Sequence, residues 1–438
     1  MADDRTYLRE YYLNLVPDPL DAGSAWYVPV YERLCAADQT AEDPVDLLAQ
    51  QVFFSTDASI HLFSGFIGTG KSTELRRLRR RLEGDGNLVL LIDMEPLLNP
   101  TAPLDITVFL TRLAGGVENE AIAQRYIDAS TTRPRFSERL VDFLDRVGFD
   151  FARFKLDAKV ASVEIEGRLR KDDSFREAVQ ASLAGSLLQL STEVTDYLTT
   201  IISEMKARSG TSNVVVIVDS VEKLRDTEQT DGAVMRSVRT VFARHCDLLR
   251  VPGAQTIYTA PPDLEVWEGP AVAANFDAGA QKLGAVRLAT RSGDDYEPGL
   301  RILCEVVKAR APEGDWERLF GGDEQVERLA RMSGGHIRQL LLAVRETIIR
   351  TTTLPASPET IEAAIRQLRR AFGVLADDQV EWLRHVRDHR RPPITTDADR
   401  ERFTHALDAL MVFMYRNGDE WYGVNPLLDA ELDANARP

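Results

Sequence analysis

The stretch Gly65-Phe66-Ile67-Gly68-Thr69-Gly70-Lys71-Ser72-Thr73 decides how the rest of the chain is interpreted. An apolar segment, residues 60–63, precedes it, and residues 73–82 carry leucines at helical spacing after it. The glycines allow the backbone to turn its N–H groups toward phosphate oxygens, and the N-terminus of the following helix adds partial positive charge there. A strand, a glycine-rich turn and a helix in this order predict a phosphate-binding loop, the P-loop, rather than a flexible glycine turn.

The residues of this loop have separate predicted roles. Lys71 is expected to contact the β- and γ-phosphates of a nucleotide, and the Ser72 hydroxyl is expected to bind Mg²⁺. The predicted cofactors are therefore ATP or ADP together with Mg²⁺. The residues expected to bind the nucleotide are Gly65, Gly68, Thr69, Gly70, Lys71, Ser72 and Thr73.

A P-loop protein also needs a carboxylate that helps to hold Mg²⁺. Asp219 directly follows the apolar run Val214–Val218, a pattern typical of a strand that is buried on both faces. Asp219 is therefore the second predicted metal-binding residue and a candidate catalytic residue together with Lys71. The alternative is an aspartate that only marks the turn at the end of the strand.

Three further residues are candidates for catalysis. Glu222 lies shortly after Asp219 and is either the group that orients the attacking water or a surface residue at the start of a helix. Thr259 ends another apolar strand and is either a sensor of the γ-phosphate or an ordinary strand-end threonine. Arg338 follows two glycines in the first turn of a helix, where a cation is unfavourable unless it serves a phosphate or a partner carboxylate.

The whole chain has 438 residues, a net charge of −16 and three scattered cysteines. Its length predicts two or three domains, and its cysteines suggest no disulfide framework, so the reducing cytoplasm is the expected location. No signal peptide and no membrane span is expected. The acidic charge disfavours nucleic acid, although a local basic face is compatible with it, and a protein partner or a homo-oligomer is expected instead.

Apolar strands alternate with helical segments in the part of the chain around the P-loop. Besides the strand before the loop, strands are expected at residues 87–94, 214–219, 254–260 and 284–289. This alternation predicts a three-layer α/β/α core with a parallel sheet, in which ligands bind at the carboxyl ends of the strands.

The C-terminal part of the chain has a different pattern. Helices expected at residues 297–311, 323–332 and 337–350 would form a helical lid after the core. Asn417-Gly418 is a strong turn signal and predicts a hairpin within residues 410–424. Helices followed by a terminal hairpin predict a winged helix.

The distance between Lys71 and Asp219 predicts an insertion in the core, at about residues 120–205. Alternating polar and apolar residues over 155–170 predict a β-hairpin or ribbon there. Apolar residues then recur at helical spacing from Phe175 to Met205 and predict one long amphipathic helix. Its apolar stripe is more consistent with packing inside the protein than with a partner site.

Together these motifs resemble the AAA+ and STAND branches of P-loop ATPases, especially bacterial proteins akin to the Orc/Cdc6-like ATPases. The matching segments are the P-loop, a Walker B-like strand over 214–224, a sensor 1 strand that ends in Thr259, and a sensor 2 segment, Ser333–Arg338. The resemblance implies an N-terminal segment over 1–50, an ATPase core over 51–290, a lid over 291–355 and a winged-helix-like domain over 356–438.

The sequence departs from the AAA+ pattern in two places. Ser220 follows Asp219 where active AAA+ proteins carry a glutamate, and no arginine lies between Pro261 and Gly284, where an arginine finger would be expected. These departures favour a slowly hydrolysing nucleotide switch over a ring ATPase. The resemblance alone implies a role in bacterial signalling or in antiviral defence against phage.

Two alternatives stay open beside this switch. An Orc/Cdc6-like DNA-binding ATPase would need a basic C-terminal domain, but residues 371–438 hold eight arginines against thirteen acidic residues. A scaffold that retains a nucleotide only for stability would bind ATP and ADP alike and would show no turnover.

Overall fold

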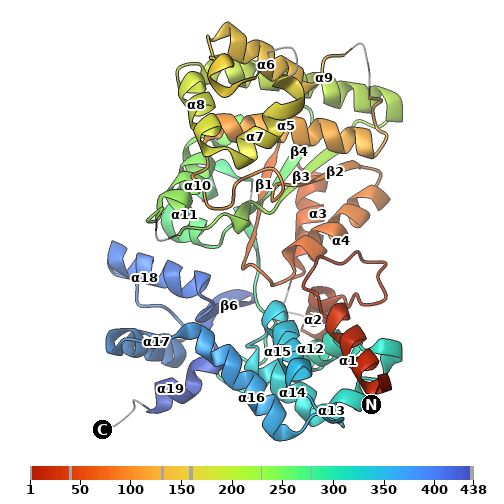
Figure 1. Cartoon of the computed structure of the whole chain (residues 1–438), viewed down its shortest axis with the longest axis vertical. Helices are drawn as coiled ribbons and strands as arrows, with labels where there is room; N and C mark the ends of the chain where they lie inside the picture. The colour runs from red at the N-terminus through yellow and green to blue at the C-terminus, as the bar shows by residue number, and fades with distance from the viewer. Residues whose placement is uncertain are drawn as a thin grey trace. The chain divides into compact units, whose positions relative to one another are not determined.

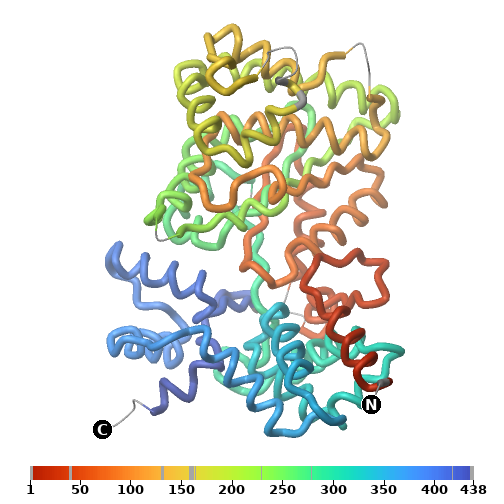
Figure 2. The backbone as a smooth tube through the Cα atoms, viewed as in Figure 1, coloured from red at the N-terminus to blue at the C-terminus, as the bar shows by residue number. Residues whose placement is uncertain are grey.

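The computed structural model describes residues 2–38, 42–129, 133–156, 161–227, 229–277 and 279–434. The chain forms two compact units, and each unit is built from separate stretches of sequence. Unit 1 comprises Met1–Leu47, Gly65–Arg77 and Lys282–Pro438, and unit 2 comprises Leu48–Ser64 and Leu78–Gln281. The P-loop therefore belongs to the same unit as the C-terminal part of the chain, and Figure 2 lets the backbone be followed along its length.

A five-stranded sheet forms the α/β part of the chain. Its strands, in the order β2-β3-β4-β1-β5, are β1 (Ile60–Gly65), β2 (Leu88–Asp93), β3 (Val214–Asp219), β4 (Gln255–Ala260) and β5 (Ala280–Leu283). β2 pairs with β3, β3 with β4 and β4 with β1, all in parallel. Every residue of β3 is buried, so helices cover both faces of the sheet, and the predicted three-layer α/β architecture is confirmed.

The helices of unit 2 follow the strands along the chain. They are α5 (Ile106–Ala123), α6 (Phe136–Arg146), α7 (Ala161–Lys171), α8 (Asp173–Ala184), α9 (Leu187–Ser209), α10 (Ala233–Arg244) and α11 (Asp263–Asn275). Two more helices, α3 (Pro44–Phe54) and α4 (Lys71–Gly84), contribute residues to both units. In Figure 1, α5 to α9 gather on one side of the sheet.

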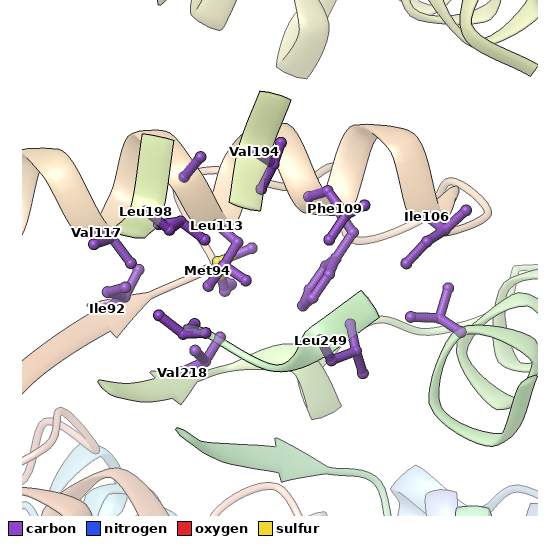
Figure 3. Packing of buried hydrophobic residues seen from close by; sticks show 14 of the residues in the cluster. Ile92, Met94, Ile106, Phe109, Leu113, Val117, Val194, Leu198, Val218 and Leu249 are labelled. Carbon is purple, nitrogen blue, oxygen red and sulfur yellow. The ribbon is translucent and has the colours of Figure 1, made fainter. Parts of the chain in front are cut away.

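The core of unit 2 lies between the sheet and these helices. Phe109 and Leu113 of α5 pack with Val194 and Leu198 of α9 and with Val218 of β3 (Figure 3). α5 starts at Asp105, whose carboxylate accepts hydrogen bonds from the N–H groups at the start of the helix. This core holds the carboxyl end of β3 in place.

Two segments of unit 2 differ from the sequence prediction. The prediction of a β-hairpin or ribbon over 155–170 is wrong, because residues 161–171 form α7. Ile165 and Leu169 of this helix are buried at the i, i+4 spacing of a helix. Residues 157–160 lie outside the described residues. The single long helix expected from 175 to 205 is instead α8 and α9, with Gly185 and Ser186 between them. Its apolar stripe is nevertheless buried in the core, as predicted.

Unit 1 is mostly helical, and a hairpin precedes its last helix. Its helices are α1 (Ala2–Asn14), α2 (Val30–Ala37), α12 (Glu297–Lys308), α13 (Glu317–Phe320), α14 (Asp323–Met332), α15 (Ile337–Arg350), α16 (Pro358–Arg369), α17 (Asp377–His389), α18 (Asp397–Asp408) and α19 (Asp429–Ala434). The hairpin predicted from Asn417-Gly418 is confirmed: β6 (Val412–Asn417) and β7 (Asp419–Val424) pair antiparallel around Gly418.

The fifth strand of the sheet lies earlier than predicted. β5 ends at Leu283, so residues 284–289 are not the edge strand that the sequence suggested. The N–H of Ala285 donates to the Met414 carbonyl at 2.9 Å, and the N–H of Val286 donates to the Gly335 carbonyl at 3.0 Å. The backbone after β5 is therefore bonded to the hairpin and to the turn before α15.

Candidate phosphate-binding site

The P-loop continues directly from β1 and ends at α4, whose first residue is Lys71. Gly68 and Gly70 have φ angles of +95° and +102°, values that favour glycine. Lys71 is only 3% exposed, and its amino group donates to the carbonyl oxygens of Gly65 at 2.7 Å and Phe66 at 2.8 Å. The ammonium group thus lies over the loop at the positive end of α4, a combination that favours an anion.

The three hydroxyl groups of the loop differ in their surroundings. Thr69 donates to the Phe66 carbonyl at 2.9 Å, and the Thr73 hydroxyl accepts the N–H of Leu20 at 3.1 Å. Ser72 is half-buried, and its hydroxyl makes no hydrogen bond to any described residue. Of the predicted nucleotide-binding hydroxyls, Ser72 is therefore the one that remains available to a cation.

The first turn of α15 packs against the tip of the loop. The backbone N–H of Arg338 donates to the Gly68 carbonyl at 3.1 Å, and Nε2 of His336 lies 2.9 Å from the Ile67 carbonyl. A Cβ at Gly68 would lie 2.7 Å from Cβ of Arg338 and 2.7 Å from Cε1 of His336. The loop and the sensor 2 segment, which the sequence analysis proposed separately, are thus in direct contact within unit 1.

The contacts of His336 define its protonation state. The Ile67 carbonyl only accepts, so Nε2 carries the hydrogen, and Nδ1 accepts the N–H of Gln339 at 3.2 Å, so Nδ1 carries none. Burial lowers the pKa of His336 to about 4, although its bond to Ile67 opposes the shift, and the charges of Arg338 and Lys71 lower the pKa further. The imidazole is therefore neutral at physiological pH and caps the start of α15.

Arg338 brings a second cation to the loop. Its Cβ and Cδ lie beside Gly68, and its guanidinium forms no ion pair with any described residue. Nε of Arg338 is buried and has no hydrogen-bond partner in the part of the chain that the structure describes. An unsatisfied guanidinium beside a loop that already holds a buried lysine fits a ligand with several negative charges.

Two side-chain groups hold the base of the loop. The Tyr31 hydroxyl lies 2.8 Å from the Thr69 carbonyl and 2.9 Å from the Gly284 carbonyl, and burial raises its pKa well above the usual value, so it stays protonated. Arg77 of α4 bonds Glu74 at 2.8 Å and Asp43 at 2.6 Å, in a cluster that is largely buried. Arg77 thereby ties the segment before α3 to α4.

The other predicted catalytic residues lie at the carboxyl edge of the sheet, in unit 2. Asp219 is the last residue of β3, and the register places Thr259 beside Phe63 near the end of β1. The Thr259 hydroxyl is buried and accepts the N–H of Val221 at 3.1 Å. Strand ends that the sequence predicted separately therefore meet at one edge, as expected for a parallel sheet.

The turn after Asp219 is unusual. Ser220 has a φ of +71°, which is strained for a residue other than glycine, and its N–H donates to the Asp219 carboxylate at 2.7 Å. Glu222 follows on a short 3-10 turn, Val221–Lys223, and is only 4% exposed. The structure therefore places Glu222 in the interior and not on the surface at the start of an α-helix.

Sequence reasoning missed two residues of this region. His336 was noted only as part of the sensor 2 segment, although it contacts the P-loop directly. Asp93, the last residue of β2, pairs in register with Asp219 and adds a second carboxylate at the sheet edge. The sequence shows that Asp93, like Asp219, ends an apolar strand. It does not show that these two strands are neighbours in the sheet.

Comparison with solved structures finds similarity over nearly the whole chain. Cdc6p from Pyrobaculum aerophilum is 10% identical with a TM-score of 0.42, covering 96% of this chain and 97% of that chain. The Aeropyrum pernix ORC2 protein, in ADPNP-ADP complexes, is 11% identical with a TM-score of 0.40, covering 94% and 98%. The Aeropyrum pernix ORC1 protein in complex with DNA is 14% identical with a TM-score of 0.36, covering 97% and 96%.

No protein-family model and no curated protein matches the sequence. At the identities and TM-scores of the solved structures, the likeness transfers no activity, ligand or partner to this chain. None of the described helices is both long and apolar enough to cross a membrane.

Proposed function

We propose that this chain is a P-loop protein that binds ATP or ADP through residues 65–73. The observation that supports this most is the pair of cations at the loop: the buried ammonium of Lys71 and the guanidinium of Arg338, which has no ion-pair partner among the described residues. Both charges act on His336, which lies between the loop and α15. A nucleotide phosphate chain would place negative charge beside both cations and would accept hydrogen bonds from the loop N–H groups.

The proposed roles follow from the positions of the residues. Loop N–H groups and Lys71 would bind the phosphates, and Arg338 would contact the γ-phosphate from the predicted lid. The available hydroxyl of Ser72 fits a Mg²⁺ ligand, and Asp219 is proposed as its carboxylate partner. When bound, Mg²⁺ would supply positive charge to the phosphate oxygens.

We propose slow hydrolysis for the same site. Glu222 is the candidate for orienting water, and Thr259 is the candidate for sensing the γ-phosphate through its hydroxyl hydrogen, since its oxygen already accepts from Val221. Ser220 stands where a glutamate would make a stronger base. The protein would therefore act as a nucleotide switch, alone or with a protein partner or as a homo-oligomer.

The test is a binding titration of ADP and of ATP with Mg²⁺, together with phosphate release, on the whole chain. Lys71→Ala is expected to weaken nucleotide binding at least about ten-fold, which is about 1.4 kcal/mol. Lys308→Ala is the matched control, because Lys308 lies in the same unit and is ion-paired with Asp323. Binding that is equal in wild type and Lys71→Ala would refute the proposal, and ATP binding without phosphate release would favour the scaffold alternative.

A DNA-binding ATPase is the second candidate, favoured by one observation. The helices α17 and α18 followed by the hairpin β6–β7 have the order of a winged helix. Against it, the two arginines of α18, Arg400 and Arg402, are ion-paired with Asp397 at 2.7 Å and Asp378 at 2.8 Å. Salt-dependent binding of a DNA duplex, measured by fluorescence anisotropy, would support this candidate.

The solved structures named above are Orc and Cdc6 proteins, the group of the DNA-binding alternative, and nothing in the described structure supports a signalling or defence role. The division into four domains remains a prediction from the sequence. The proposed lid contains α12 to α15, and the proposed winged helix contains α16 to α19.

A further inference from the structure

The turn between α14 and α15 brings three parts of unit 1 together. A Cβ on Gly335, whose φ is +83°, would approach the Val286 carbonyl to 1.8 Å. A Cβ on Gly334, whose φ is +58°, would approach the Phe413 ring to 2.6 Å. Both the backbone angle and the close contacts therefore require glycine, and the turn fits tightly against the segment after β5 and against the hairpin.

His336 follows this turn and touches both the P-loop and the hairpin. Besides its hydrogen bonds to Ile67 and Gln339, its ring stacks on Phe413 of β6 with 5.5 Å between the ring centroids and 24° between the planes. In the same strand, the Tyr415 hydroxyl donates to the Gly334 carbonyl at 2.6 Å. One buried, neutral side chain thus contacts the loop, the start of α15 and the hairpin.

The bond to Ile67 has a direct consequence for the loop. A peptide group is planar, so the Ile67 carbonyl and the Gly68 N–H point in opposite directions from one plane. Because His336 bonds the Ile67 carbonyl, it fixes the orientation of this peptide plane. The Gly68 N–H is then held pointing away from His336. His336 therefore fixes the direction of a backbone donor in the loop through its bond to the preceding carbonyl.

We propose that His336 is a positioning residue for the P-loop, and that its stack on Phe413 transmits occupancy of the loop to the hairpin β6–β7. The proposal rests on the proposed nucleotide binding. A nucleotide that orders the loop would strengthen the His336 contacts, and the hairpin would be ordered with them. By thermodynamic reciprocity, loosening the hairpin would weaken nucleotide binding by the same factor.

Two substitutions of His336 separate positioning from helix capping. In His336→Asn the side-chain carbonyl caps α15 well, but the side chain is too short to reach Ile67. In His336→Gln the amide is long enough to donate to Ile67, but glutamine is a poor cap. If His336 only caps the helix, His336→Asn should lose less ADP affinity than His336→Gln. If His336 positions the loop, His336→Gln should lose less ADP affinity than His336→Asn.

The experiment is calorimetric titration with ADP of wild type and both variants, after urea unfolding has shown that each variant is folded. We expect an affinity about ten-fold weaker in His336→Asn and within about three-fold of wild type in His336→Gln. The reverse order, or equal affinities in all three proteins, would overturn the positioning role. If wild type itself binds no ADP, the proposed function fails first; if Lys71→Ala loses binding and His336→Asn does not, only this inference fails.

Phe413→Leu tests the transmission without touching the hydrogen bonds of His336. Hydrogen exchange of residues 412–424 is measured with and without ADP. In wild type, ADP is expected to slow exchange several-fold, and in Phe413→Leu the protection is expected to disappear while ADP still binds, with an affinity weakened by no more than that same factor. Exchange that does not respond to bound ADP in wild type would overturn the transmission.

Discussion

At the scale of single residues, the P-loop depends on a position without a side chain. Gly68 combines a φ of +95° with the close approach of His336 and Arg338. Gly86, in the turn after α4, has a similar φ of +87°, but nothing lies within 4 Å of an added Cβ. The two glycines therefore share the backbone requirement and differ in the space around them.

Gly68→Ala is expected to weaken ADP binding at least about ten-fold, because the methyl group would push both side chains away from the loop. Gly86→Ala is expected to keep the wild-type affinity and to lower the free energy of unfolding by about 1 kcal/mol through backbone strain alone. Calorimetric titration and urea unfolding of both variants measure these effects. Equal affinities in the two variants would show that the contacts at Gly68 do not matter for binding.

The buried His336 predicts a specific dependence of stability on pH. Its pKa is about 4 in the folded chain, against 6.5 for an unperturbed histidine, chiefly because burial disfavours the charged ring. Its contribution to stability is therefore fully present above pH 6.5 and is lost as the pH falls from 6.5 through about 4, because the unfolded chain takes up the proton first. The full difference corresponds to about 3 kcal/mol.

When the pH falls from 7 to 4.5, we expect the free energy of unfolding to decrease less in His336→Gln than in wild type. The difference between the two decreases should be most of the about 3 kcal/mol that His336 contributes. Burial raises the pKa of Glu74 to about 7, so this carboxyl acts in the opposite direction, but it is present in both proteins and cancels in the comparison. Urea unfolding at the two pH values measures the difference. Parallel pH profiles would mean that His336 is not buried and neutral as described.

At the scale of elements, α1 is bound to the end of α12 by side-chain hydrogen bonds to backbone carbonyls. Tyr11 and Asn14 donate to the carbonyls of Val307 at 2.9 Å and Arg310 at 3.0 Å. The Val307 carbonyl also accepts the N–H of Arg310 at 3.2 Å, so Tyr11 adds a second donor at the end of α12. The N-terminal helix therefore belongs to the packing of unit 1.

Tyr11→Phe is expected to lower the free energy of unfolding of unit 1 by about 1 kcal/mol, because it removes one buried hydrogen bond and keeps the ring. Tyr12→Phe on the same helix is the control: its ring lies 4.1 Å from the Arg345 guanidinium, a contact that phenylalanine retains. Thermal or urea unfolding compares the two variants. An equal loss in both would mean that the Tyr11 hydroxyl contributes nothing beyond its ring.

Elements that depend on local patterns could be predicted from the sequence, and elements that depend on distant contacts could not. β3 and the hairpin were predicted because an apolar run and an Asn-Gly turn are local signals. The break at Gly185 was missed, because the apolar stripe continues on both sides of it. β5 was placed too late, because the backbone after Leu283 is bonded to the hairpin, a partner far along the chain.

The candidate site shows the same division. Lys71 and Asp219 were predicted from motifs, but the contact of His336 with Ile67 joins residues 269 positions apart in the sequence. No local pattern signals that pairing, and a histidine after two glycines has many other interpretations. The sequence could name the phosphate loop and the sensor 2 segment, and only the folded unit shows how the two are bonded.

At the scale of the whole molecule, the proposed ligands of the nucleotide belong to both units. The P-loop and Arg338 lie in unit 1, and Asp219, Glu222 and Thr259 lie in unit 2. A ligand that binds only the folded state, at a concentration 100 times its dissociation constant, stabilises that state by about 2.7 kcal/mol. Which unit is stabilised depends on which of these residues the ligand contacts.

Hydrogen exchange of the whole chain is therefore expected to respond in two steps. ADP without Mg²⁺ should slow exchange in unit 1, at residues 65–77 and 333–340, because the loop and Arg338 of α15 are proposed to bind the phosphates. Addition of Mg²⁺ should extend the protection to residues 219–224 of unit 2, because Asp219 is proposed to hold the cation. Asp219→Asn should remove the second step and keep the first, whereas Asp247→Asn, an exposed aspartate of unit 2, should keep both. Protection of residues 219–224 that survives in Asp219→Asn would refute the assignment of Mg²⁺ to Asp219, while leaving the binding of phosphates by unit 1 intact.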